Sequence, residues 1–472
     1  MTIPKRHHVV IGDGATAAAF AESARVGPND RLTVIGRDIG NLGRGLAYGD
    51  HPDDAPWRYA YLLNSPSAAV LPDFADWLTA RWDEVARTME RRRPDWLGFG
   101  ADHIAAADHA ALFAPRAIFG DYLAHLARTG LDRHRANGVD LRLVSDDAIA
   151  IEPCDTGFRL LLSGGEQIIA TDVDLAPGTP AMDMFCADAG PAAFPMVYGR
   201  EEAIRERLTP GASVICIGAN AAMLDVLRFL QSVMAEVDIR MTVISATGLR
   251  PEPLIWTRPR RPAVTPEIDA RFDTCAALMD AVDREIARLR RDEGATMAEL
   301  RPGFKSWASA EKLADLLPDR AERRRVTQAL ERRFRRGTHD TIADYHRLLK
   351  AGQITEVQGR AKGVTQSVGG ATVVIGTNKG EVALEAPVII NCAGPGTRLA
   401  LDPLSLSLLD LGWLNRTEDG SGLRVGAGLA IGPVGLRYLA PPVTEIGDAV
   451  MPFPLFDLGG LRAEVARANG IA

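Results

Sequence analysis

The chain has 472 residues, about three times the ~150 residues of a typical domain, so two or three domains are expected. Its 46% hydrophobic and 24% charged residues are globular values, which exclude a disordered or fibrous chain. Because the net charge is −7 and neither an export signal nor a run of ~18 apolar residues occurs, we expect a cytoplasmic protein with no nucleic-acid or membrane partner.

The N-terminal segment predicts a dinucleotide-binding βαβ unit. A β-branched run at 7–11 is followed by Gly12-x-Gly14-x-x-Ala17, an alanine-rich helix and a second strand at 32–35. In such a unit the first glycine permits a tight turn, and the second lets a pyrophosphate approach the backbone. The helix N-terminus adds partial positive charge. The residues predicted to bind a nucleotide here are Gly12, Gly14, Ala15 and Thr16.

The sequence leaves two interpretations of the adenosine ribose position at this first site. The second strand is followed by Gly36, where an Asp or Glu usually takes the ribose hydroxyls. Asp38 lies two residues later and is the candidate for that role. Arg37 would instead favour a phosphorylated ribose, and hence NADP. We favour FAD at this site because of the motifs that follow in the chain.

A second βαβ unit is predicted from residue 213 onward. Its strand leads into Gly218-Ala219-Asn220, where asparagine replaces a glycine and tolerates left-handed backbone angles. Ser245 ends the next strand and Arg250 follows, a pair without an acid that a 2′-phosphate would prefer. We therefore predict that this site binds a nicotinamide nucleotide, NADPH with NADH as the alternative, through Gly218, Asn220, Ser245 and Arg250.

The rest of the chain is expected to alternate between helical and strand-forming segments. Residues 72–137 and 267–350 have helical periodicity, and a strand-rich segment follows at 354–391. Near the C-terminus, Gly447-Asp448 places a carboxylate on a glycine turn, where it can accept a hydrogen bond from a ribityl hydroxyl. The predicted fold class is α/β, with two Rossmann-like dinucleotide-binding domains and a helical insertion.

Taken together, these motifs resemble the two-dinucleotide-binding flavoproteins. The chain is most similar to FAD/NAD(P)-binding proteins that carry a GxGxAYG…LLNxP segment, read here at 43–49 and 62–66, and to flavin-dependent N-hydroxylating monooxygenases. It departs from the family pattern at Gly36, at Asn220 and after His346. The resemblance implies that both ends of the chain bind FAD and that the middle domain binds NAD(P)H. Further cofactor contacts implied by the resemblance are Arg44, Tyr48, Leu63, Asn64, Cys392, Ala393, Gly394, Gly447 and Asp448.

Three domain segments follow from this resemblance. We expect 1–205 to form the first part of an FAD-binding domain, and 206–350 to form an NAD(P)-binding domain with a helical segment. We expect 351–472 to complete the FAD-binding domain.

The resemblance also narrows the reaction. The five cysteines form no CxxC pair, so a dithiol relay is excluded. The remaining chemistry is an NAD(P)H-reduced flavin that passes electrons to O₂ or to an organic substrate. The leading hypothesis is a monooxygenase that hydroxylates a small amine-bearing acid. The alternatives are a flavin dehydrogenase or reductase without oxygen insertion, and a degenerate, non-catalytic nucleotide-binding protein.

The sequence gives only weak indications of the substrate site. No catalytic triad, metal-ligand cluster or paired-carboxylate motif stands out, so no catalytic residue is named and no metal is expected. The expected partners are a small-molecule substrate and O₂, and a homo-oligomer is compatible with the sequence. A substrate carboxylate would need cationic hosts, for which the candidates are Arg258, Arg335, His346 and Arg347.

Overall fold

The computed structural model describes residues 6–71, 73–185, 189–255, 259–394, 399–453 and 458–470. The chain divides into two compact units, each assembled from segments that are distant in the sequence. Unit 1 comprises residues 1–50, 119–180 and 401–472, and unit 2 comprises residues 51–118 and 181–400. Within the described ranges, no helix is both long enough and apolar enough to cross a membrane.

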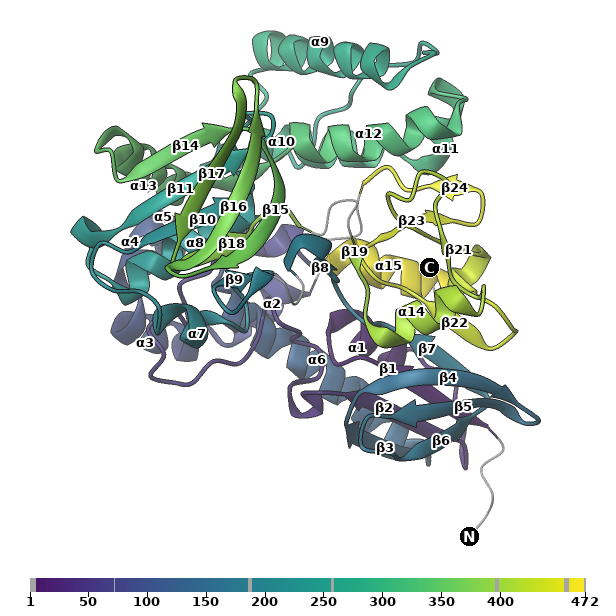
Figure 1. Ribbon diagram of the computed structural model, residues 1–472. Helices are drawn as coiled ribbons and strands as arrows, with labels where there is room; N and C mark the ends of the chain where they lie inside the picture. Colours follow the sequence, from purple (N-terminus) through teal and green to yellow (C-terminus); the bar gives the residue numbers. More distant parts are fainter. Residues whose placement is uncertain are drawn as a thin grey trace. The chain divides into compact units, whose positions relative to one another are not determined.

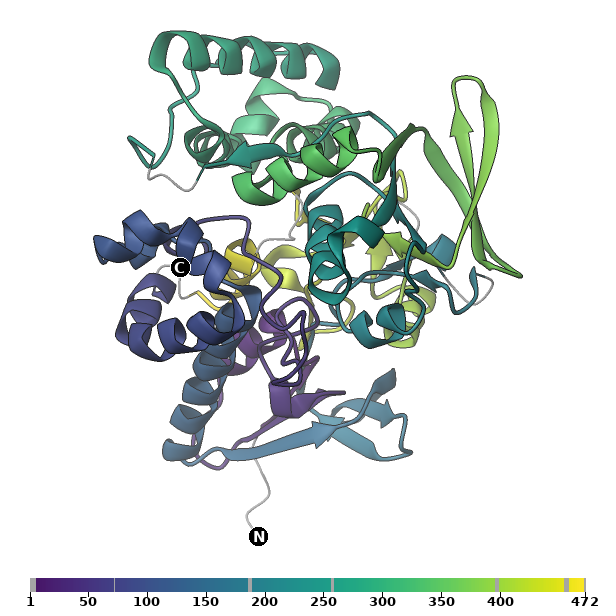
Figure 2. The ribbon, with the colours of Figure 1, turned by 90° about the vertical axis from the view of Figure 1, so that its left-hand side faces the viewer.

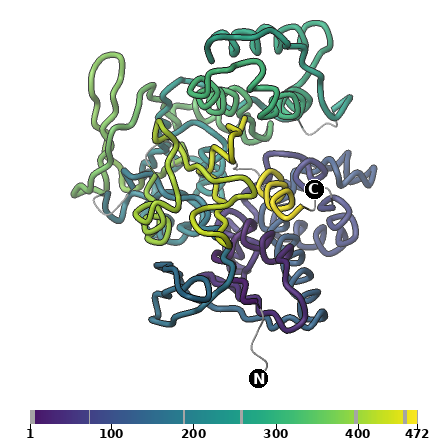
Figure 3. The backbone as a smooth tube through the Cα atoms, turned by 90° about the vertical axis from the view of Figure 1, so that its right-hand side faces the viewer, coloured from purple at the N-terminus to yellow at the C-terminus, as the bar shows by residue number. Residues whose placement is uncertain are grey.

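Unit 1 is built on a five-stranded parallel sheet in the order β22-β7-β1-β2-β3. Two of its central strands contain short buried apolar runs, at residues 9–11 of β1 and 34–35 of β2, as expected for strands that are covered on both faces. Figure 3 shows the C-terminal part of the chain, in yellow, lying beside the N-terminal part, in purple. The five strands are β1 (His7–Ile11), β2 (Arg31–Gly36), β3 (Asp140–Ser145), β7 (Asp172–Leu175) and β22 (Leu436–Tyr438).

Helices and two smaller sheets complete unit 1. The helices are α1 (Ala15–Glu22), α6 (Arg116–Ala136, in this unit from residue 119), α14 (Pro403–Asp410) and α15 (Leu458–Ala468). An antiparallel sheet contains β4 (Ala148–Cys154), β5 (Gly157–Leu162) and β6 (Gln167–Ala170). A four-stranded sheet contains β20 (Asn415–Arg416), β21 (Leu423–Val425), β23 (Val443–Ile446) and β24 (Ala449–Val450).

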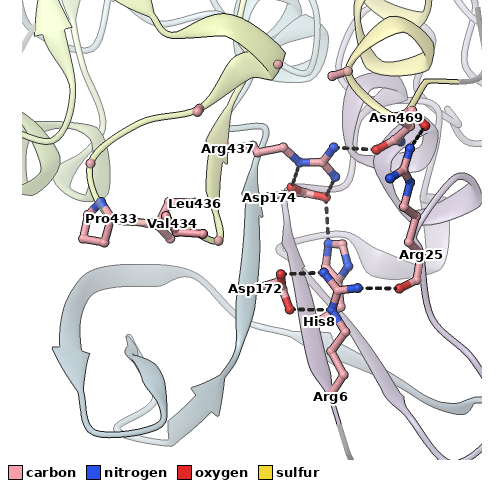
Figure 4. A pocket seen from close by; sticks show the side chains of 15 residues that line it. Arg6, His8, Arg25, Asp172, Asp174, Pro433, Val434, Leu436, Arg437 and Asn469 are labelled. Atoms are coloured by element: carbon pink, nitrogen blue, oxygen red, sulfur yellow. Dashed lines mark hydrogen bonds and ion pairs between the residues drawn. The ribbon is translucent and has the colours of Figure 1, made fainter.

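A buried ionic cluster attaches the C-terminal strand β22 to the rest of the first sheet (Figure 4). Arg437 donates two hydrogen bonds of 2.6 Å to the Asp174 carboxylate, and His8 Nε2 lies 2.7 Å from Asp174 Oδ2. Burial acts to raise the pKa of Asp174, but hydrogen bonds and charge from His8 and Arg437 outweigh it and lower this pKa. A cavity of about 340 Å³ lies beside the cluster and is also lined by Arg6 and Arg25.

Unit 2 is built on a second five-stranded parallel sheet, in the order β14-β11-β10-β18-β9. Helices α8 (Ala221–Val233) and α13 (His339–Lys350) share one hydrophobic core with this sheet, and an antiparallel sheet β15-β16-β17 shares another (Figure 1). The parallel strands are β9 (Ala193–Phe194), β10 (Ser213–Ile217), β11 (Arg240–Ser245), β14 (Ile354–Gln358) and β18 (Val388–Asn391). The antiparallel strands are β15 (Arg360–Ser367), β16 (Gly370–Thr377) and β17 (Gly380–Ala386).

The remaining elements of unit 2 are mostly helical. Four helices of the predicted insertion gather in one cluster (Figure 2): α9 (Cys275–Glu293), α10 (Met297–Trp307), α11 (Ala310–Leu316) and α12 (Arg320–Arg333). Short helices precede α6 or β10, namely α2 (Phe74–Ala80), α3 (Trp82–Arg92), α4 (Pro94–Phe99), α5 (Ala101–Ala105) and α7 (Glu201–Arg205). Two strand pairs join β12 (Glu252–Leu254) to β13 (Arg336–Thr338) and β8 (Ala181–Met182) to β19 (Leu399–Ala400).

The predicted α/β class, with two parallel-sheet units and a helical insertion, is confirmed. The division of the chain differs from the predicted boundaries at three places, of which the first is residues 181–205, which lie in unit 2 and not in unit 1. Residues 351–400 lie in unit 2, because β14 pairs with β11 and β18 pairs with β10. Residues 51–118 also lie in unit 2, although they follow the first βαβ motif in the sequence. The segment that completes unit 1 therefore begins at residue 401.

Candidate nucleotide-binding sites

The first glycine loop joins β1 to α1 in unit 1. Gly12 has a φ of +121°, and a Cβ atom at this position would overlap the carbonyl oxygen of Ala176 beside it. A Cβ on Gly14 would have only the Cα of Gly45 within 4 Å, at 3.8 Å. Gly14 is the N-cap of α1, which begins with the predicted residues Ala15 and Thr16. The loop therefore presents open backbone at a helix N-terminus, the arrangement that accepts a phosphate.

Arg44 precedes Gly45, whose Cα lies nearest to Gly14, and part of the hydrogen-bonding capacity of its side chain is unused. Its Nη2 donates a hydrogen bond of 2.7 Å to Asp121 Oδ1. Its Nε and Nη1 atoms are buried, and among the described residues they have no hydrogen-bond partner. Leaving buried N–H groups unpaired is costly, so these atoms indicate a place for an anion that the protein itself does not supply. A cofactor pyrophosphate fits this requirement.

The segment that carries Arg44 is fixed against α6. A Cβ on Gly43 would lie 2.8 Å from the carbonyl oxygen of Leu123, and one on Gly120 would overlap the carbonyl oxygen of Tyr48. The Tyr48 ring meets the Phe119 ring edge-on, at 5.1 Å between centroids. Glycines at 43 and 120 thus let the segment lie directly on the helix. The same segment meets the first glycine loop, where the Gly43 N–H donates a 2.9 Å hydrogen bond to the Asp13 carbonyl oxygen.

The structure explains Gly36, where the sequence departs from the pattern of an acidic strand end. A Cβ on Gly36 would lie only 2.6 Å from Cβ of Asp13, so the Asp13 side chain fills the space that a larger residue would need. Asp13 Oδ2 accepts a hydrogen bond of 2.8 Å from the Asp38 backbone N–H. Sequence reasoning passed over Asp13, which stands at the variable position of the glycine motif. Arg37 is held by Asp147, 2.7 Å from Nε to Oδ1.

Asp448 lies in unit 1, the unit that also contains the first glycine loop. Gly447 has a φ of +60° and forms the turn between β23 and β24. The Asp448 side chain at this turn is exposed. Its hydrogen bond to a ribityl hydroxyl stays a prediction.

The second glycine loop joins β10 to α8 in unit 2. Gly218 has a φ of +112°, and a Cβ there would lie 2.6 Å from the backbone nitrogen of Ala393. The Cys392 N–H donates a 2.8 Å hydrogen bond to the Ile217 carbonyl oxygen, because β18 and β10 are neighbours. The turn 392–394 therefore packs on the second glycine loop. These residues were expected to contact a cofactor, and the structure brings them together with Gly218.

Asn220 has a different role from the one expected of its backbone. Its φ is −137°, so it does not use the left-handed conformation that the sequence suggested. Instead, Asn220 is the N-cap of α8, and its Oδ1 accepts a 3.0 Å hydrogen bond from the Ala222 N–H. Asparagine is among the best capping residues, so its presence stabilises the helix that follows the loop.

Residues 9–180 match the family model described as FAD-NAD(P)-binding. A comparison with curated proteins gives no match. Among solved structures, the chain is similar to an ornithine N-hydroxylase of Kutzneria sp. 744, with 12% identity, a TM-score of 0.55 and coverage of 99% of this chain and 98% of that one. It is similar to an ornithine hydroxylase of Pseudomonas aeruginosa, with 14% identity, a TM-score of 0.55 and coverage of 99% and 97%. For an L-lysine 6-monooxygenase of Pseudomonas syringae the identity is 13%, the TM-score 0.54 and the coverage 98% of both chains. The fold that the motifs predicted is thereby confirmed.

The ribose end of the second site lies where β11 ends. Ser245 closes this strand, and its Oγ accepts a 3.1 Å hydrogen bond from the Gly248 N–H. Arg250 was expected to face a 2′-phosphate. In the structure its guanidinium group is paired with Glu356 through both Nε and Nη2. Any phosphate at this position would therefore meet an arginine that already has a carboxylate partner.

The predicted residues Leu63 and Asn64 lie in unit 2, on a segment that two arginines hold by its backbone. Arg116 Nε donates to the Leu62 carbonyl oxygen at 3.2 Å, and Arg336 Nε donates to the Asn64 carbonyl oxygen at 2.7 Å. The Leu63 N–H donates to the Ala114 carbonyl oxygen at 2.9 Å. The segment is thus fixed by its main chain, and no described residue hydrogen-bonds to the Asn64 side chain.

Of the predicted substrate residues that the structure describes, Arg335 lies apart from His346 and Arg347. Arg335 lies at the second glycine loop, with Nη1 3.4 Å from the Ala219 carbonyl oxygen, and burial lowers the pKa of its guanidinium. Arg347 is exposed and paired with Glu236. Glu236 precedes β11, so this pair lies at the start of the parallel strands, whereas the second glycine loop lies at their end. His346 is exposed beside Arg347. Arg258 lies outside the described residues. No cluster of metal-ligating side chains occurs in the part of the chain that the structure describes.

A buried glutamate near the segment 62–65 titrates in the neutral range. Glu201 is 3% exposed, and its Oε1 accepts a 3.3 Å hydrogen bond from Tyr61 Oη and lies 3.8 Å from His51 Nε2. Burial raises the pKa of Glu201 to about 7, although hydrogen bonds, including that from Tyr61, act to lower it. At mildly acidic pH the side chain is therefore a neutral acid in the folded protein.

The substitution Glu201→Gln should make stability less sensitive to pH. Because the pKa of Glu201 is raised in the folded protein, its contribution is fully present below the unfolded pKa of about 4.3 and is lost as pH rises towards 7. The neutral amide avoids this loss. In urea unfolding, the free energy of unfolding of the variant relative to that of the wild type should rise by up to roughly 3 kcal/mol between about pH 5 and about pH 8. The exposed neighbour Glu202→Gln serves as control, and parallel pH profiles for wild type and Glu201→Gln would contradict the assignment.

Proposed function

We propose that this chain is an FAD-dependent, NAD(P)H-using monooxygenase that hydroxylates the nitrogen of a small amine-bearing acid. The main support for this proposal is the pair of glycine loops. Each loop joins the end of a parallel strand to the start of a helix, and Arg44 lies in the segment that meets the first loop. Arg44 offers two buried N–H groups without a described partner. Full-length similarity to the fold of ornithine and lysine hydroxylases supports the reaction class, and the Kutzneria enzyme is described with reduced FAD, NADP⁺ and L-ornithine.

The two cofactors would be held by different parts of the chain. In unit 1, the open backbone at Gly14 and the guanidinium of Arg44 would bind the FAD pyrophosphate, with Asp13 or Asp38 close enough to Gly36 to serve the ribose. In unit 2, the loop 218–220 and Arg335 would bind the nicotinamide nucleotide. Bound FAD would supply the chemistry, because it accepts a hydride from NAD(P)H and passes electrons to O₂.

Two of the predicted residues, Arg335 and Asn64, have surroundings that suggest what they bind. Because Arg335 lies at the second glycine loop, its guanidinium is better placed for a nucleotide phosphate than for a substrate that would also contact Arg347. Asn64 has a fixed backbone and a side-chain amide available for hydrogen bonding, so it stays a candidate for a flavin or substrate contact. A cytoplasmic location suits an enzyme that draws on NAD(P)H.

The visible absorption spectrum of the purified protein tests this proposal. We expect a flavin spectrum that bleaches anaerobically with NADPH, followed by oxygen uptake that depends on added ornithine, lysine or aspartate. A hydroxylamine product should accumulate in proportion to the oxygen consumed. Bleaching without substrate-coupled oxygen uptake would support a reductase instead. A protein that stays colourless after incubation with FAD would overturn both enzymatic interpretations and support a degenerate nucleotide-binding protein.

A further inference from the structure

Arg250 and Glu356 form a two-point ion pair at the ribose end of the second nucleotide site. Arg250 Nε donates to Glu356 Oε1 at 2.7 Å, and Nη2 donates to the second carboxylate oxygen. The two side chains are 42% and 29% exposed, so a ligand in solution has access to both of them. Paired guanidinium and carboxylate groups of this geometry are among the stronger surface interactions.

This ion pair lies close to the position at which a βαβ unit binds the adenosine ribose of its nucleotide. In a dinucleotide-binding βαβ unit, the residue at the end of the second strand contacts the adenosine ribose. Here that strand is β11, which ends at Ser245, and Arg250 follows five residues later. Glu356 lies on β14, the strand that pairs with β11 on this side of the sheet. The ion pair thus stands where a 2′-hydroxyl is distinguished from a 2′-phosphate.

Glu356 is held in its charged form. Partial burial acts to raise its pKa, but hydrogen bonds from Arg250 and from Tyr345 Oη, the latter 2.6 Å from Glu356 Oε1, lower the pKa overall. A 2′-phosphate that approaches Arg250 must therefore displace or share a fixed negative charge. A ribose hydroxyl meets no such repulsion and can donate a hydrogen bond to the carboxylate.

We propose that Glu356 is a specificity-determining residue that holds Arg250 and thereby lowers the preference of this site for NADP(H) over NAD(H). This inference rests on the nicotinamide-binding part of the proposed function and adds to it the residue that sets the cofactor preference. Glu356 acts through Arg250 on the phosphate and through its own carboxylate on the hydroxyl.

The substitution Glu356→Gln tests the inference, with the affinities of NADP⁺ and NAD⁺ measured by isothermal titration calorimetry on the purified protein. Removing the charge while keeping the shape should tighten NADP⁺ binding by about tenfold, the scale of one hydrogen bond to a charged group. NAD⁺ binding should change by less than about twofold or weaken slightly. Combining Glu356→Gln with Arg250→Met should abolish the gain for NADP⁺, because the freed guanidinium produces it.

A matched control is available just before the start of β11. Glu236 forms a comparable two-point pair with Arg347 at the other end of β11, so Glu236→Gln removes the same charge away from the ribose position. If the NADP⁺:NAD⁺ affinity ratio is unchanged in Glu356→Gln, or is raised equally in Glu236→Gln, the role given to Glu356 is wrong while the nicotinamide site still stands. A wild-type protein that binds neither nucleotide overturns the nicotinamide site as well.

Discussion

Replacing Arg44 by methionine should abolish the retention of FAD without destabilising the protein that lacks it. The buried Nε and Nη1 atoms have no described partner, so a bound pyrophosphate would gain two charge-assisted hydrogen bonds from them. Their loss should weaken FAD binding by about 10²-fold or more, measured by titrating the flavin-free protein and following flavin fluorescence. The substitution removes two buried N–H groups that have no described partner, and the Asp121 carboxylate that loses its ion pair is 43% exposed. The melting temperature of the flavin-free protein should therefore not fall.

Arg37→Met is the matched control for this prediction. Arg37 is also in unit 1, near the end of β2, but its side chain is 76% exposed and is paired with Asp147. Its removal should leave FAD affinity within about twofold of the wild type, because exposed ion pairs contribute little. Wild-type FAD affinity in Arg44→Met would show that the first glycine loop binds its ligand without this arginine, or does not bind FAD.

Replacing Asp174 by alanine should lower the free energy of unfolding by about 3–5 kcal/mol, the typical cost of removing one partner from a buried ion pair. The substitution leaves Arg437 and His8 without their shared carboxylate, and the His8 and Asp174 side chains are almost fully buried. The loss should be visible in chemical denaturation at neutral pH. It should fall mainly on unit 1, because Asp174 and Arg437 join β7 to β22.

This destabilisation should shrink in acid. The pKa of Asp174 is lowered in the folded protein, so its contribution is present above the unfolded pKa of about 3.9 and is lost as pH falls further. The gap between wild type and Asp174→Ala should therefore narrow below about pH 4. Asp147→Ala, which removes a partly exposed aspartate in the same unit, should cost less than about 1 kcal/mol. An equal loss in both variants would show that the Asp174 cluster does not stabilise the sheet.

Both glycine loops were predictable because their requirements are local. Gly12 and Gly218 adopt positive φ angles immediately after a strand, and each is followed within three residues by the first turn of a helix. A strand, a glycine turn and a helix are encoded by consecutive residues. The periodicity that predicts them needs no knowledge of what packs against them.

The structure explains two residues that look anomalous in the sequence, one by a neighbour in space and one by a local cap. Gly36 departs from the usual acidic strand end because Asp13, which lies 23 positions earlier, occupies the adjacent space. Asn220 departs from the glycine pattern because it caps α8. Both departures from the family pattern therefore have a role in the structure, close packing at Gly36 and helix capping at Asn220.

The sequence by itself determined the α/β class, the two glycine loops and the helical insertion, since each follows from periodicity or from a short motif. Arg44 became a candidate ligand through the resemblance to a known family. The tertiary structure decided the division into units, the pairing of Arg250 with Glu356 and the separation of Arg335 from Arg347. Those features depend on which strands become neighbours: β14 and β18 join β10 and β11 only after long intervening segments. Contacts such as Arg437 with Asp174, 263 positions apart, arise from that topology. No local pattern of residues encodes them, because the free energy that selects them comes from burial and pairing across the whole sheet.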